Sequence, residues 1–176
     1  MPHISSWARF CVVAILAVGF VSTLGTSGTA LAARVRPSHR VHQIIYSIGP
    51  CHGTCPAYEV TLASDGGVTF VGNQFTSYLG RKLLRREHGL FARVVGQLAA
   101  TQPVARRQTI AATNCSLYAT DQQTVTITWQ EGGRSDRILE FDLGCHDPQF
   151  GVTRRLISGA RRLLPIDSLV GRRTEF

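Results

Sequence analysis

Residues 51–56 read Cys-His-Gly-Thr-Cys-Pro and bring two thiols close together in the chain. Thiols at this spacing have three kinds of chemistry open to them. They form a disulfide, bind a soft metal ion, or exchange electrons with another dithiol. Which of the three applies depends on the redox compartment and on the structure that follows Cys55.

The first part of the chain has the features of a cleaved export signal. Arg9 supplies a positive charge, residues 10–21 are apolar, and residues 29–32 end in the small-x-small pattern that signal peptidase accepts. The apolar run is shorter than the ~20 residues that span a bilayer. We therefore predict a signal peptide over residues 1–32, a secreted or periplasmic protein, and no transmembrane segment after cleavage.

Cleavage would remove Cys11 and leave an even number of cysteines. An even count in an exported chain indicates disulfides, and four cysteines allow three pairings. We expect the pairing of Cys51 with Cys55 and of Cys115 with Cys145. The four cysteines are Cys51, Cys55, Cys115 and Cys145.

A thiol-disulfide exchange site is the main alternative. Cys-x-x-x-Cys-Pro resembles the motif of the copper-delivering Sco proteins, which have a thioredoxin-like scaffold. In a thioredoxin-type site the cysteines begin a helix, and its N-terminus lowers the pKa of a thiol. Here Tyr58, Val60 and Leu62 alternate with polar residues, which predicts a strand and removes that cause of reactivity.

Copper or zinc binding is a further alternative, because imidazoles stand beside the thiols. The candidate ligands are Cys51, His52, Cys55 and His146. Adjacent residues rarely reach the same ion, and the chain has no paired Cys-x-x-Cys signature of a zinc site. We therefore expect no resident metal or other cofactor.

Other catalytic motifs are missing from the sequence. It contains no Gly-x-Ser-x-Gly elbow, no His-Glu-x-x-His, no phosphate-binding loop and no dinucleotide fingerprint. We predict no catalytic residues, and thiol-disulfide exchange is the one enzyme class that the sequence leaves open.

The chain is basic, with a formal charge of +8 carried almost entirely by arginine. Such a balance is compatible with an anionic partner, and an anionic envelope polymer or another protein is the candidate, but a solvated arginine-rich surface explains the same charge and is the interpretation we prefer. No nucleic-acid motif accompanies the charge, so we expect no nucleic-acid partner. Four arginines recur on the last predicted helix, where we expect a solvated face opposite the apolar stripe. These are Arg154, Arg155, Arg161 and Arg162.

Hydrophobic periodicity predicts the order of the elements. Strands are expected over residues 41–48, 58–62, 68–70, 75–79, 124–129 and 139–143, with turns at Asp65-Gly66-Gly67 and Glu131-Gly132-Gly133. Helices are expected over residues 90–99 and from Pro148 to about Leu164, the second capped by Asp147.

This order predicts a disulfide-stabilised α+β fold. The main elements follow the order β-ββ-α-ββ-α, which favours an antiparallel sheet of about five strands with two helices on one face. We expect residues 33–40 to be a polar lead-in, residues 41–168 to be a single domain, and residues 169–176 to be a flexible tail.

A set of residues spread along the chain forms a recognisable pattern, namely residues 51–58, Asp65-Gly66, Gly72, Gly80, Tyr118 and Thr120-Asp121. With this pattern the mature chain resembles a bacterial domain-of-unknown-function family, number 6438. His52 departs from the aromatic usual there, Phe70 stands where tyrosine is common, and Gln122-Gln123 replaces a frequent Leu-Pro. The motif residues are Gly53, Thr54, Pro56, Tyr58, Asp65, Gly66 and Asp121. The resemblance implies an exported or envelope-associated domain with no established activity.

These observations favour one function over the others. We expect an exported binding or structural module of the bacterial envelope that is not an enzyme. A thiol-disulfide redox or copper- or zinc-handling protein is the alternative.

Overall fold

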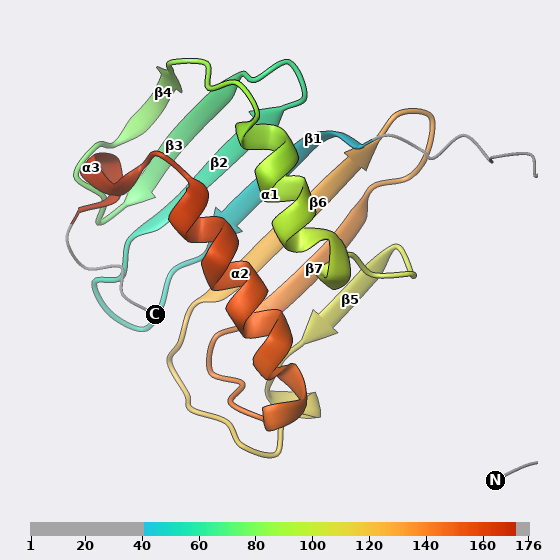
Figure 1. Cartoon of the computed structure of the whole chain (residues 1–176). Helices are drawn as coiled ribbons and strands as arrows, with labels where there is room; N and C mark the ends of the chain where they lie inside the picture. Colours follow the sequence, from blue (N-terminus) through green and yellow to red (C-terminus); the bar gives the residue numbers. More distant parts are fainter. Residues whose placement is uncertain (1–40, 172–176) are drawn as a thin grey trace, which may run out of the picture. The chain divides into compact units, whose positions relative to one another are not determined.

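A computed structural model describes residues 41–171, which form a mixed α+β fold (Figure 1). The strands are β1 (Val41–Ile48), β2 (Ala57–Ala63), β3 (Val68–Gln74), β4 (Gly80–Leu84), β5 (Arg107–Ile110), β6 (Thr124–Glu131) and β7 (Arg137–Asp142). The helices are α1 (Leu90–Leu98), α2 (Gly151–Leu163) and α3 (Asp167–Val170), with short 3-10 turns η1 (Ala99–Thr101), η2 (Ala112–Asn114) and η3 (Pro148–Phe150). The predicted signal peptide over residues 1–32 and the lead-in over residues 33–40 lie outside the described residues.

Alternating side chains give the sheet one buried face. In β1, Ile44, Tyr46 and Ile48 are buried, while the residues between them are only partly covered. The same alternation runs through β2, β3 and β6. Helices α1 and α2 lie over the buried face (Figure 1), and α1 contributes its apolar stripe to the core. The buried residues of that stripe are Leu90, Val94 and Leu98.

The sheet has seven strands in the order β4-β3-β2-β1-β6-β7-β5. The expected number of about five is therefore too low. All neighbouring strands are antiparallel except β5 and β7, which are parallel, so the expectation of a wholly antiparallel sheet is also wrong. Strand β5 escapes prediction because only Ile110 of its four residues is buried.

The predicted strand over residues 75–79 is a loop, and β4 begins only after it, at Gly80. The loop folds back against β3, where a Cβ on Gly72 would overlap the carbonyl oxygen of Tyr78. Gly80 then takes a φ of 88°, a left-handed conformation that glycine adopts at low cost. The backbone geometry, rather than the apolar side chains of the loop, decides where the strand starts.

The domain continues past residue 168, where we expected a flexible tail to start. Leu169 and Val170 belong to α3 and are buried, and the Tyr78 N–H donates to the Leu169 carbonyl at 3.0 Å. The beginning of the expected tail over residues 169–176 is therefore part of the fold, while residues 172–176 lie outside the described residues.

Asp147 does not cap α2 as predicted. The chain first makes η3, whose N-cap position Asp147 occupies without a side-chain cap hydrogen bond, and α2 begins later, at Gly151. No helix among residues 41–171 is long and apolar enough to cross a bilayer.

Candidate functional site

The sheet has two ends with different chemistry. At one end β1 and β7 finish and β2 and β6 begin, and we call this the disulfide end. The opposite end, where β6 finishes and β7 begins, is the arginine end. Both disulfides belong to the first end: Cys51 is bonded to Cys55 and Cys115 to Cys145, each pair with a Cα–Cα distance of 5.6 Å.

The side chain of Gln123 holds the Cys51–Cys55 loop in place. The amide of Gln123, a buried residue, donates to the Gly49 carbonyl at 2.7 Å and to the Pro56 carbonyl at 2.8 Å. One side chain thus joins both ends of the loop to the start of β6. Strand β2 begins at Ala57, immediately after the loop, so no helix N-terminus acts on Cys55.

The Cys115–Cys145 bridge is surrounded by further contacts. Cys145 is fully buried. The Asp147 carboxylate beside it accepts hydrogen bonds from the Ser116 N–H at 2.9 Å, the Ser116 hydroxyl at 2.8 Å and the Leu117 N–H at 2.7 Å. These hydrogen bonds lower the pKa of Asp147 below its ordinary value. Asp147 therefore fastens the segment after Cys115 rather than capping a helix.

Tyr118 and Gly144 form a close contact at the same end. The Tyr118 hydroxyl donates to the Asp142 carboxylate at 2.8 Å, which raises the pKa of Tyr118. The other oxygen of Asp142 accepts from the Gly144 N–H at 2.8 Å. A Cβ on Gly144 would overlap the Ala119 carbonyl oxygen, so the position needs glycine. Asp121, in the loop that follows, has a φ of 64°.

Tyr58, the last residue of the first motif, is a core residue. Its ring stacks on Phe70 with centroids 5.8 Å apart, and the Arg161 guanidinium lies 5.8 Å from the ring centre. Burial raises the pKa of Tyr58 to about 12. Arg161 in turn contacts the Asp167 carboxylate at 2.9 Å. These contacts join β2 to α2 and to the start of α3.

The predicted arginine face of α2 is wrong for two of its four members. Arg161 is only 4% exposed, and half-buried Arg154 donates to the carbonyls of Leu143 and Cys145. Arg154 and Arg161 are seven residues apart and therefore lie on the same side of the helix, which they share with buried Ile157. This side faces the sheet. Of the four arginines, only Arg155 and Arg162 are exposed.

The four proposed metal ligands do not form a cluster. Within residues 41–171, one group of three thiol, imidazole or carboxylate ligands lies close enough to share an ion, namely Cys115, Cys145 and Asp147. Its two sulfurs are bonded to each other. His52 and His146 are exposed and belong to no such group in this part of the chain.

A family model described as "Domain of unknown function (DUF6438)" matches residues 42–150. The chain belongs to the DUF6438 family. Among curated proteins and solved structures, no match to the chain is found.

Most of the motif residues of this DUF6438 domain gather at the disulfide end. Asp65 and Gly66 are the exception, because they form the β2–β3 turn at the opposite end. The Asp65 carboxylate accepts from the Gly67 N–H at 2.9 Å, and Gly66 has a φ of 87°. The contacts of Gly53, Pro56, Tyr58 and Asp65 all lie within the domain, which gives these motif residues a role in building the fold.

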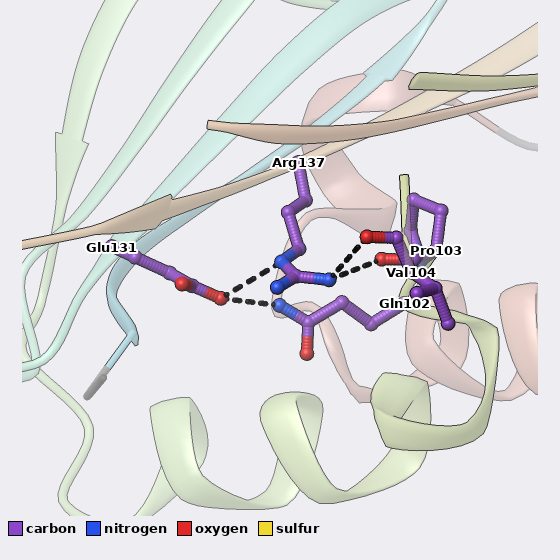
Figure 2. A network of polar contacts seen from close by, with 5 residues as sticks. All are labelled: Gln102, Pro103, Val104, Glu131 and Arg137. Atoms are coloured by element: carbon purple, nitrogen blue, oxygen red, sulfur yellow. Dashed lines mark hydrogen bonds and ion pairs between the residues drawn. The ribbon is translucent and has the colours of Figure 1, made fainter. Parts of the chain in front are cut away.

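The arginine end carries a network of polar contacts that joins the chain after α1 to the β6–β7 hairpin (Figure 2). The Glu131 carboxylate accepts from the Gln102 amide at 2.8 Å and pairs with Arg137 at 3.4 Å. Arg137 donates to the carbonyls of Pro103 at 2.7 Å and Val104 at 2.9 Å. Through these contacts the network fixes the segment that leads into β5.

Beside this network lies an open groove of about 550 Å³. It is lined by Arg106, Arg107, Arg134, Ser135, Asp136 and Ile138. A smaller hollow of about 220 Å³ shares Arg106, Arg134 and Ser135 with it. We refer to the larger hollow as the arginine groove.

Two arginines of the groove have no carboxylate partner. Arg107 pairs with Glu140, whose pKa is lowered by hydrogen bonds from Thr109 and from Arg107 itself. Arg106 and Arg134 are exposed and make no ion pair within the described part of the chain.

Sequence reasoning missed the arginine groove because its two halves are far apart in the chain. Arg106 directly precedes β5 and Arg107 is its first residue, whereas Arg134 lies in the turn before β7. The parallel pairing of Arg107 with Ile138 brings the two segments together. The adjacent arginines at positions 106 and 107 were visible in the sequence as a possible binding feature. Because β5 was not predicted, nothing in the sequence placed them beside Arg134.

Proposed function

We propose that this DUF6438 domain is an exported, disulfide-stabilised binding module of the bacterial envelope, and that its arginine groove holds anionic groups of an envelope polymer. The observation that carries the proposal is the pair Arg106 and Arg134, which line one groove without a carboxylate partner in the described residues. The two disulfides are consistent with an oxidising compartment outside the cytoplasm.

The chemistry of the groove fits an oxyanion. A guanidinium presents planar donors that match the two oxygens of a phosphate or a carboxylate. The Ser135 hydroxyl adds a neutral donor, and Ile138 supplies an apolar wall. Arg107 is paired with Glu140, so Arg106 and Arg134 against Asp136 still leave the lining positive, and an anion gains attraction there as well as hydrogen bonds.

The preformed backbone around the groove strengthens the proposal. The Ile138 N–H donates to the Arg106 carbonyl at 2.8 Å, and the Arg134 N–H donates to the Glu131 carbonyl at 3.2 Å. Both arginine segments are therefore held before a ligand arrives, which reduces the entropy lost on binding.

The alternative, a thiol-disulfide redox or copper- or zinc-handling protein, has less support. The bond between Cys51 and Cys55 leaves neither sulfur free to bind a metal ion, and the loop leads into a strand instead of a helix, so the usual cause of thiol reactivity is missing there. We therefore propose a role in binding rather than in catalysis.

The test compares two variants of equal charge. The Arg106→Ala, Arg134→Ala double variant changes the groove, and the Arg155→Ala, Arg162→Ala double variant removes two exposed arginines from α2. Binding of polyphosphate and of polygalacturonate would be measured by calorimetry at low salt. The groove variant should bind the preferred polymer about tenfold more weakly, and the α2 variant should bind it like the original protein.

Comparison of the two polymers separates a preference for phosphate from one for carboxylate. Equal losses in the two variants would show that only overall charge matters, and this result would contradict the proposal. Binding by the groove variant that matched the original protein would contradict it as well.

A further inference from the structure

Strand β4 is the outermost strand at one edge of the sheet that residues 41–171 form. It pairs with β3 on one side and is the last strand in the sheet order (Figure 1). Four of its five residues are exposed. An edge strand offers a row of backbone N–H and C=O groups that can hydrogen-bond to a further strand.

Apolar side chains gather next to this edge. Phe75 is 54% exposed, Leu79 64% and Leu83 72%, and Tyr78 is also exposed. These four residues lie in β4 or in the loop before it. They make up most of the large exposed apolar residues in the part of the chain that the structure describes, and the others are Val104, Leu117 and Val152. Such a concentration is typical of an interaction surface.

The same edge is strongly basic. Arg81 and Lys82 lie within β4, and Arg85 and Arg86 follow it directly. Arg86 pairs with Asp65 at 3.1 Å, and Lys82 lies 4.9 Å from the centre of the Tyr78 ring. Arg81, by contrast, has no ion pair among residues 41–171.

The positions of the side chains define what a neighbouring strand must offer. Leu83 is paired with Thr69 and Arg81 with Val71, so Leu83 and Arg81 project from the face of the sheet opposite the helices. Lys82 is paired with Phe70 and projects from the other face. An incoming strand therefore meets a cation on each face and an apolar side chain on one.

This charge disfavours a second copy of the chain as the occupant. Antiparallel pairing of two β4 strands centred on Lys82 would place the two lysines opposite each other, and like charges directly opposite are destabilising. An acidic strand would instead be attracted to β4, because each of its carboxylates would approach a cation of this edge.

We propose that β4 binds an extended, acidic peptide segment of a partner protein, which adds to the sheet as an eighth strand. The backbone of the segment pairs with the free side of β4, acidic side chains lie opposite Arg81 and Lys82, and an apolar side chain packs on Leu83. This site is separate from the arginine groove, which lies at the other edge of the sheet beside β5 and β7.

The probe is a synthetic peptide of about eight residues in which two adjacent central glutamates are flanked by valines, a length that matches ordinary strands. Adjacent residues of a strand project from opposite faces, so one glutamate can approach Arg81 and the other Lys82. Its binding would be followed by fluorescence anisotropy. Arg81→Glu with Lys82→Glu should weaken binding about tenfold and create binding to a matched valine-lysine peptide. Arg155→Glu with Arg162→Glu is the control of equal charge and should bind the acidic peptide more tightly than the β4 variant does. The Arg106→Ala, Arg134→Ala variant should bind it like the original protein.

A second comparison separates strand addition from simple charge attraction. N-methylation of two adjacent central amides blocks both backbone edges of the peptide without changing its charge, and the same methylation at the N-terminal end serves as its control. The centrally methylated peptide should lose binding while the control peptide keeps it. Equal binding of both peptides would overturn the proposal, and so would an equal loss in the β4 and α2 variants or no binding of the acidic peptide.

Discussion

The two ends of the sheet differ in how their polar groups are used. At the disulfide end, the Asp142 and Asp147 carboxylates and the Gln123 amide bond to groups of the same domain. At the arginine end, Glu131 and Arg137 are also satisfied within the domain, but Arg106 and Arg134 line a groove without a carboxylate partner in the described residues.

This difference separates the residues that build the fold from those that are free to bind. The cysteine motif is the most conspicuous feature of the sequence, yet its two cysteines are bonded to each other. The arginines of the groove belong to no motif, yet they offer hydrogen-bond donors to a ligand. A conspicuous pattern of cysteine, glycine and tyrosine is thus compatible with a purely structural role.

Removal of the Cys115–Cys145 bridge should produce the largest loss of stability. Cys115→Ala with Cys145→Ala should lower the free energy of unfolding by about 3.7 kcal/mol, because the bridge closes a long loop in the unfolded chain. Cys51→Ala with Cys55→Ala removes a bridge that closes only a short loop, and should cost about 2 kcal/mol. Urea unfolding measures both losses. A larger cost for the shorter loop would contradict this order.

Both cysteine variants should keep their affinity for polyphosphate under conditions where they stay folded. A large loss of affinity in either variant would mean that the disulfide end takes part in binding, and the contrast between the two ends would be wrong.

One added methyl group should lower the free energy of unfolding at the closely packed disulfide end but not at the open β6–β7 turn of the arginine end. Gly144→Ala places a Cβ on the Ala119 carbonyl and beside the Tyr118 ring, and should cost about 2 kcal/mol. Gly132→Ala is the matched control in the β6–β7 turn, because no atom lies within 4 Å of its added Cβ. Urea unfolding of both variants checks the difference, and equal stabilities would contradict it.

The smallest effect is a change in the acid sensitivity of unfolding. The folded pKa of Asp147 is lowered from an ordinary value of 3.8, so its stabilising effect is present above that value and is lost as the pH falls through the folded pKa. Asp147→Asn should therefore be less stable than the original protein at pH 7, and the difference should shrink as the pH falls below 3.8. Urea unfolding at a series of pH values measures it. A difference that did not change with pH would show that the charge of Asp147 is unimportant.

Local pattern predicted much of the fold but not how distant segments meet. Strand β1, the β2–β3 hairpin and helix α1 have clear apolar periodicity, and the structure contains them. Strand β5 has one buried residue and α3 has a single turn, so neither leaves a periodic signal.

The candidate site was harder to predict than the fold. Arg161 looked like a surface residue because arginine is usually exposed, but its position on the inner line of α2 places it on the ring of Tyr58. The arginine groove depends on the β5–β7 pairing, which no local pattern of residues specified.

The most direct test of the contrast between the two ends is amide hydrogen exchange, followed by mass spectrometry, of the protein with and without polyphosphate. Bound polymer should slow exchange in residues 104–107 and 131–138, which surround the arginine groove. It should leave residues 49–56 and 115–123 at the disulfide end unchanged. Protection confined to the disulfide end would contradict the assignment of binding to the arginine groove.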